Sequence, residues 1–139
     1  MQANRDRAVD FSSDGFIRDA VKKINEFKSP PDVVNALNRH LSENKKPLDP
    51  HITSIEIANK KGIVIASTHE VLMRNDVSNY EAFKQSIDKG YGKTIVDRPG
   101  YCSAANANVL TIYSPIISMA DKETIGVIII CFDMFAFRK

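Results

Sequence analysis

The sequence lacks an apolar segment long enough to cross a lipid bilayer. Its longest apolar run spans residues 125–132, whereas a membrane-spanning helix needs about 20 residues. No apolar stretch follows Met1, as one would in a secretory signal peptide. The 139-residue chain is therefore expected to be a single soluble domain, with any membrane anchors lying beyond its two ends.

The sequence also lacks the common signatures of catalytic and metal sites. His40, His51 and His69 stand far apart, without an HExxH motif or a His/Cys cluster, so no metal is expected. Residues 92–94 read Gly-Lys-Thr, like the end of a phosphate-binding loop, but Ile87 stands where the loop's first glycine belongs. With no GxSxG elbow either, the domain is expected to be neither an enzyme nor a cofactor-binding protein.

The distribution of charge excludes one class of partner. The formal net charge is +2, with acids and bases interspersed. No basic stripe follows the chain, so nucleic acid is not an expected partner.

The sequence leaves open whether its two cysteines pair with each other. Cys102 and Cys131 form no CxxC pair. We expect Cys131 to be a buried free thiol on a strand and Cys102 to lie in a loop.

Helical periodicity dominates the first third of the chain. Apolar residues recur at helical spacing up to Phe27, which predicts a long first helix. Residues 12–14 are N-cap types that precede Gly15, so the helix is either interrupted or restarts there. Sparse apolar residues before that point favour a projecting stalk, and we take residues 1–27 as this stalk helix. A second helix starts after Ser29 and ends within residues 44–47.

The period then changes to that of strands. Residues 53–57 alternate apolar and polar, which predicts a half-buried strand, and residues 63–67 return as its hairpin partner. A third helix runs from the Ser78 and Glu81 capping box to Gly90, and the last three strands are expected at residues 91–97, 108–117 and 125–132. The final strand is apolar at nearly every position, so it should be central and covered on both faces. The fold class is therefore α+β, with one five-stranded antiparallel sheet and flanking helices.

Polar and aromatic residues concentrate around the third helix and in the strands that follow it. In a sheet domain, loops over one face are where a small ligand is commonly held. The candidate ligand-binding residues are His69, Arg74, Tyr80, Phe83, Tyr91, Arg98, Tyr101, Tyr113 and Ser114. Each also has a structural explanation: Tyr80 suits a core, Arg74 a solvated surface, and Arg98 a turn before proline.

Several local strings carry a resemblance to a known family. They are residues 13–18 (SDGFIR), 37–50 (LNRHLSENKKPLDP), 55–67, 75–83 (NDVSNYEAF), and 113–116 together with 125–127. In this order and spacing the chain resembles the Cache family, also called PDC. These are the PAS-like extracytoplasmic sensor domains of histidine kinases, chemoreceptors and diguanylate cyclases. The similarity is closest to the sensor domains of membrane histidine kinases.

The resemblance implies a role as well as a fold. It implies a long N-terminal helix following one membrane span, a central antiparallel sheet, and a last strand leading into a second span. A small ligand, such as a carboxylate or an amino acid, would sit between the sheet and the loops around the third helix. Any kinase or cyclase activity would belong to other parts of the full-length protein. The aromatic and basic residues 135–139 suit an approach to a membrane surface.

One family motif is only half present. In the citrate and C4-dicarboxylate sensors, an arginine stands three residues before a histidine, and both hold carboxylates. Here His69 falls at the place of the histidine, but Ala66 occupies the place of the arginine, which removes the residue best suited to bidentate carboxylate binding.

Two alternatives to ligand sensing remain open. One is a PAS-like interaction or dimerisation module that binds a protein partner and no small molecule. The other is a Cache domain that has lost its ligand and passes on mechanical or dimer-state signals. Long first helices of this kind commonly pair in receptor dimers, so a homodimer is a further expectation.

Overall fold

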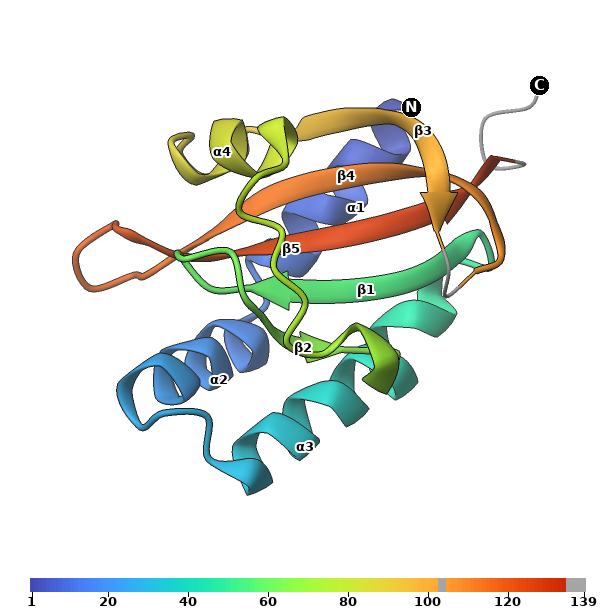
Figure 1. Ribbon diagram of the computed structural model, residues 1–139. Helices are drawn as coiled ribbons and strands as arrows, with labels where there is room; N and C mark the ends of the chain where they lie inside the picture. The colour runs from blue at the N-terminus through green and yellow to red at the C-terminus, as the bar shows by residue number, and fades with distance from the viewer. Residues whose placement is uncertain (103–104, 135–139) are drawn as a thin grey trace.

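An antiparallel sheet of five strands lies at the centre of the computed structural model, in the order β2-β1-β5-β4-β3 (Figure 1). The strands are β1 (Ile52–Ala58), β2 (Val64–Ser67), β3 (Ile95–Cys102), β4 (Ala107–Ile117) and β5 (Thr124–Asp133). Residues 1–102 and 105–134 are described, with the side chain of Arg98 excepted. Residues 135–139, expected near a membrane, lie outside them. The α+β class, the five antiparallel strands and the central place of β5 are confirmed.

Helices cover one face of this sheet, and a shorter set of elements covers the other. The helices are α1 (Gln2–Ser12), α2 (Gly15–Glu26), α3 (Pro31–His40) and α4 (Glu81–Ile87), with short helical turns η1 (Leu41–Lys45), η2 (Lys46–Leu48) and η3 (Glu70–Leu72). The first three pack on the face that buries most of the core. Helix α4 packs on the opposite face, where residues 68–80, here called the covering segment, run from β2 to α4 (Figure 1).

The first helix is interrupted where its N-cap residue types predicted, and its first part packs on the sheet where a projecting stalk was expected. The chain breaks after Ser12 and restarts with Asp14 as the N-cap of α2, whose carboxylate accepts a hydrogen bond from the Ile17 amide at 3.0 Å. Helix α1 also does not project, because Ala8 and Phe11 are buried in the core against the sheet. Two apolar residues one helical turn apart are enough to dock a mostly polar helix.

Strand β1 is buried on both faces, which the sequence pattern did not predict. Ile55 and Ile57 face the helices, as expected. Ser54 and Glu56, expected on a solvent face, are 0% and 7% exposed. The covering segment and the end of β3 lie over that second face and remove it from water.

Gly62 attaches the covering segment to the β1–β2 hairpin. Its φ of 88° lies in the left-handed region, and a Cβ there would come within 2.7 Å of Ser78. The Gly62 carbonyl accepts a hydrogen bond from the Val77 amide at 2.8 Å. A bridge between Ile63 and Asp76 continues this pairing. The turn glycine therefore allows the close approach that holds the segment over the sheet.

Strand β3 begins and ends later than expected. Residues 90–93 form a turn, with Gly92 at a φ of 84°, so pairing starts only at Ile95. The strand then continues past Pro99 through a bulge between Asp97 and Gly100, where a turn was expected. Bulges bend a strand and strengthen its twist, and the end of β3 curves over the sheet face in Figure 1.

Candidate functional site

A cavity of about 310 Å³ lies between the sheet, the covering segment and the curved end of β3. Its described lining residues are Glu56, Val64, Leu72, Asn75, Val77, Tyr80, Asp97, Gly100, Tyr101, Cys102, Val109, Thr111, Tyr113, Ile129 and Cys131. They come from all five strands and from the covering segment, so the whole fold contributes to it. The volume is at the lower end of the range for small-molecule pockets.

Glu56 contributes a buried carboxyl group to the lining of this cavity. Its Oε1 accepts a long hydrogen bond from Ser54 Oγ at 3.5 Å and a weak one from Cys131 Sγ at 4.0 Å. Its Oε2 is buried without a hydrogen-bond partner in the described structure. Burial raises the pKa of Glu56 to about 8, and the hydroxyl groups of Ser54 and Ser67 only partly offset this. Glu56 is therefore mostly protonated at neutral pH.

The neighbouring groups are also held in their neutral forms. Neither Cys102 nor Cys131 forms a disulfide bond. Contact with Cys102 and burial raise the pKa of the Cys131 thiol well above its usual value, and Thr111 Oγ1 lies 3.7 Å from its sulfur. Burial and the nearby Asp97 carboxylate raise the pKa of Tyr113. The base of the cavity is polar but uncharged at neutral pH when no ligand is present.

Of the eight predicted contact residues whose side chains are described, the structure brings three to this cavity. Tyr113 lies at its base and is 3% exposed, whereas Tyr80 and Tyr101 are more than half exposed. Phe83 packs with Tyr113 in the smaller apolar core and does not line the cavity. Ligand contact by these side chains stays a prediction.

The other predicted residues that the structure describes lie outside this cavity. His69 follows β2, where its Nδ1 is 3.0 Å from Thr68 Oγ1. Arg74 lines a separate open groove of about 760 Å³ between α3 and β2. Tyr91 is exposed in the turn before β3. The side chain of Arg98 is outside the described residues.

Ser114 lies on the opposite face of the sheet from the cavity. Its Oγ donates a hydrogen bond to Ser12 Oγ at the end of α1, at 3.1 Å. Because strand residues alternate between faces, the adjacent Tyr113 and Ser114 point to different layers. Ala66 is likewise buried among the helix-facing residues, so an arginine there would not point into this cavity.

Glu56, Asp97, Thr111 and Cys131 also line the cavity, and the sequence patterns did not predict them as candidates. The sequence did contain a signal that Glu56 is buried. The final strand was expected to be covered on both faces, and β1 is its immediate neighbour. A cover that spans the second face of β5 extends over β1 as well, so a glutamate on that face is buried.

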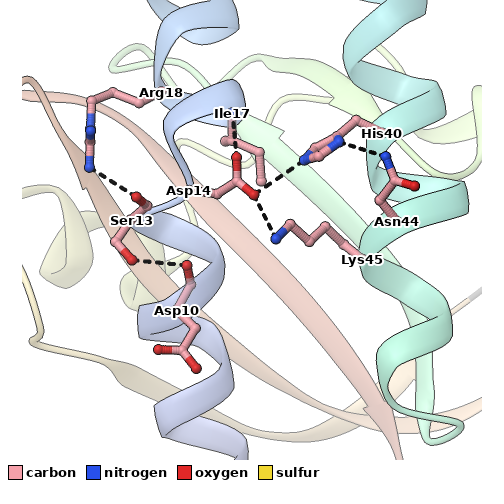
Figure 2. A network of polar contacts seen from close by, with 8 residues as sticks. All are labelled: Asp10, Ser13, Asp14, Ile17, Arg18, His40, Asn44 and Lys45. Carbon is pink, nitrogen blue, oxygen red and sulfur yellow. Dashed lines mark hydrogen bonds and ion pairs between the residues drawn. The ribbon is translucent and has the colours of Figure 1, made fainter.

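A second carboxylate, Asp14, lies on the helical side of the sheet in a different environment. Figure 2 shows it between α2 and the helical turn η1. Its carboxylate accepts hydrogen bonds from Lys45 Nζ at 2.6 Å and His40 Nε2 at 3.2 Å, besides the Ile17 amide. Asn44 Nδ2 donates to the other ring nitrogen of His40 at 2.9 Å. Partial burial opposes ionisation, but the hydrogen bonds outweigh it and lower the pKa of Asp14 to about 2.

Comparisons by sequence find no counterpart for this chain. No family model matches it, and no curated protein matches it.

Among residues 1–102 and 105–134, none of the helices combines the length and the apolar content that a membrane crossing requires.

Comparisons of structure identify the fold. The chain superposes on the sensor domain of the V. cholerae histidine kinase DctB with a TM-score of 0.67, at 19% identity over 96% of this chain. It matches the E. coli DcuS sensor domain with a TM-score of 0.56, at 14% identity, covering 94% of this chain and 85% of that one. The L-serine complex of the Pseudomonas fluorescens chemoreceptor CtaA ligand-binding domain matches with a TM-score of 0.53, at 11% identity over 86% of this chain.

These matches establish the Cache/PDC fold, as the sequence resemblance predicted. The chain spans 50% of the DctB structure and 49% of the CtaA structure, so it corresponds to about half of those two.

Proposed function

We propose that this domain is the extracytoplasmic ligand-sensing module of a transmembrane receptor, and that its ligand binds in the cavity around Glu56. The observation that carries the proposal is a small-molecule-sized cavity, lined by a buried carboxyl group with an unpaired oxygen, in a fold shared with sensor domains. Buried polar groups in proteins are normally hydrogen-bonded, so an exception inside a cavity favours a ligand.

The same strands connect the cavity to the helices. In β5, Ile129 and Cys131 line the cavity, whereas Ile128 and Ile130 pack in the helix-facing core. A ligand that shifts β5 on one face must therefore change its packing against α1 and α2 on the other. For a signal to result, the ligand must bind one arrangement more tightly than the other.

The terminal elements are placed to carry such a shift. In α1, Arg7 Nε pairs with Asp49 Oδ2 at 3.5 Å, just before β1. The Asp133 amide, at the end of β5, donates to the carbonyl of His51 in the same region. The start of α1 and the end of β5 thus lie toward one end of the molecule (Figure 1). We infer that flanking membrane spans continue from both and lead to an output domain such as a histidine kinase or a diguanylate cyclase.

A thermal-shift screen of the purified domain tests the proposal. The panel covers carboxylates, amino acids, amines and purines, each in large excess. A ligand at a hundred times its dissociation constant adds about 2.7 kcal/mol to stability, which gives a readable rise in melting temperature. A hit that Val109→Trp, which fills the cavity, abolishes supports sensing at this site. No hit across the panel would favour a ligand-free interaction or dimerisation module.

A further inference from the structure

The described lining of the cavity contains acidic side chains and no basic ones. Its carboxyl groups are those of Glu56 and Asp97, and lysine, arginine and histidine are absent among the described lining residues. A carboxylate ligand would meet these groups without a basic partner. An anion taken out of water without a positively charged partner costs free energy, so this lining disfavours a carboxylate ligand.

Glu56 has an unused capacity to accept hydrogen bonds. Its side chain is 7% exposed, Oε2 has no partner, and the bonds to Oε1 are long. An unsatisfied buried polar group destabilises the folded state. A ligand N–H group directed at Oε2 would remove this cost, and a positively charged donor would do so most strongly.

From the absence of basic side chains among the described lining residues and from the unpaired Oε2 we infer that the cavity binds a small organic amine in its protonated form, with the Glu56 carboxylate as its counter-ion. This rests on the proposed function and names its ligand class. Tyr113 at the base, with Tyr80 and Tyr101 also lining the cavity, supplies aromatic surface that favours a cation. No three His, Cys, Asp or Glu side chains of the described residues are grouped to hold a metal ion, so the geometry favours an organic cation.

Amine binding at this site releases a proton. Glu56 is mostly protonated in the free domain, and it must ionise to pair with an ammonium group. The groups around it are Ser54 on its own strand, Ser67 on β2, Cys131 on β5, and Cys102 on β3. None of these groups supplies a positive charge. Affinity should therefore rise with pH, by up to about tenfold per unit, until Glu56 is ionised in the free domain.

The experiment compares amines with acids of similar size by calorimetric titration at pH 6, 7 and 8. The pairs are butylamine with butyrate, 1,4-diaminobutane with succinate, and 2-phenylethylamine with phenylacetate. We expect at least one amine to bind, its affinity to rise about five- to tenfold per pH unit, and its matched acid not to bind. Glu56→Gln should weaken that amine at least tenfold and abolish the pH dependence. Glu26→Gln, an exposed position on α2, should change neither.

Three outcomes overturn the inference. The first is binding of an acid in preference to its matched amine. The second is amine binding that Glu56→Gln leaves unchanged while the variant remains folded by circular dichroism. The third is no amine binding when another class in the wider screen binds the cavity, in which case the sensing function stands and the ligand class is wrong. If nothing in either panel binds, the proposed function itself fails.

Discussion

One carboxyl group lies on each side of the sheet, and the two differ in their hydrogen bonds and in their pKa values. Asp14, on the helical side, receives three hydrogen bonds, and the pKa of its carboxyl is lowered to about 2. Glu56, on the cavity side, has one unpaired oxygen, and the pKa of its carboxyl is raised to about 8. The first environment is built to hold a charge, and the second lacks the group that would stabilise one.

The two carboxyl groups therefore affect stability in opposite directions as the pH changes. A lowered carboxyl pKa means that ionisation favours the folded state, so the contribution of Asp14 is present above pH 3.8 and lost as the pH falls toward 2. A raised carboxyl pKa means the reverse, so stability is lost as the pH rises from 4.5 toward 8 around Glu56. Strongly perturbed pKa values cluster at functional sites, so the buried carboxyl of Glu56 supports the proposal that the cavity binds a ligand.

The largest expected effect is the pH dependence of Glu56→Gln. Glutamine cannot ionise, so the variant avoids the loss of stability that the wild-type domain suffers as the unfolded chain releases its proton. Between pH 5 and pH 8, the free energy of unfolding of the variant should gain about 3 kcal/mol relative to wild type. Urea denaturation at four pH values measures this, with Glu26→Gln as the control. A constant difference across that range would mean that Glu56 is not buried as described.

The next effect is the loss of the Asp14 network. Asp14→Ala removes the N-cap of α2 and leaves Lys45 and His40 without their carboxylate, so the domain should lose about 2 kcal/mol at pH 7. Asp14→Asn, which keeps a capping side chain, should lose less. Asp19→Ala, an exposed aspartate on the same helix, should stay within about 0.5 kcal/mol of wild type. Equal losses for Asp14→Ala and Asp19→Ala would assign Asp14 no special role.

The contrast also explains how far the sequence could predict this protein. The order of elements, the antiparallel sheet and the central place of β5 followed from local periodicity and from one uninterrupted apolar run. The restart of a helix near Gly15 followed from N-cap residue types. These features depend on neighbours in sequence, so the sequence carries them directly.

The two carboxyl sites depend on contacts between distant segments, and the sequence pattern does not determine those. The alternation in β1 shows which residues share a face, but it does not show whether the polar face is exposed to water or covered by a loop that folds back over the sheet. Asp14 was expected as a cap, whereas its partners His40 and Lys45 come from a different helical element. Tyr113 and Ser114 were predicted together, although adjacent strand residues necessarily face opposite layers.

The smallest expected effect on stability is that of Ser54→Ala, which removes a hydrogen-bond donor from Glu56. Ser54→Ala deletes the 3.5 Å hydrogen bond to Oε1, and at pH 7 the free energy of unfolding should change by less than about 0.5 kcal/mol. The bond favours the ionised carboxylate, so its loss should raise the pKa of Glu56 further, which a carbon-detected NMR titration of the glutamate carboxyl measures. The matched change on the other face, Lys45→Met, removes a 2.6 Å bond to an ionised group and should cost about 1 kcal/mol. If the two changes cost the same, the carboxyl at Glu56 is already ionised at neutral pH, and the distinction between the two faces fails.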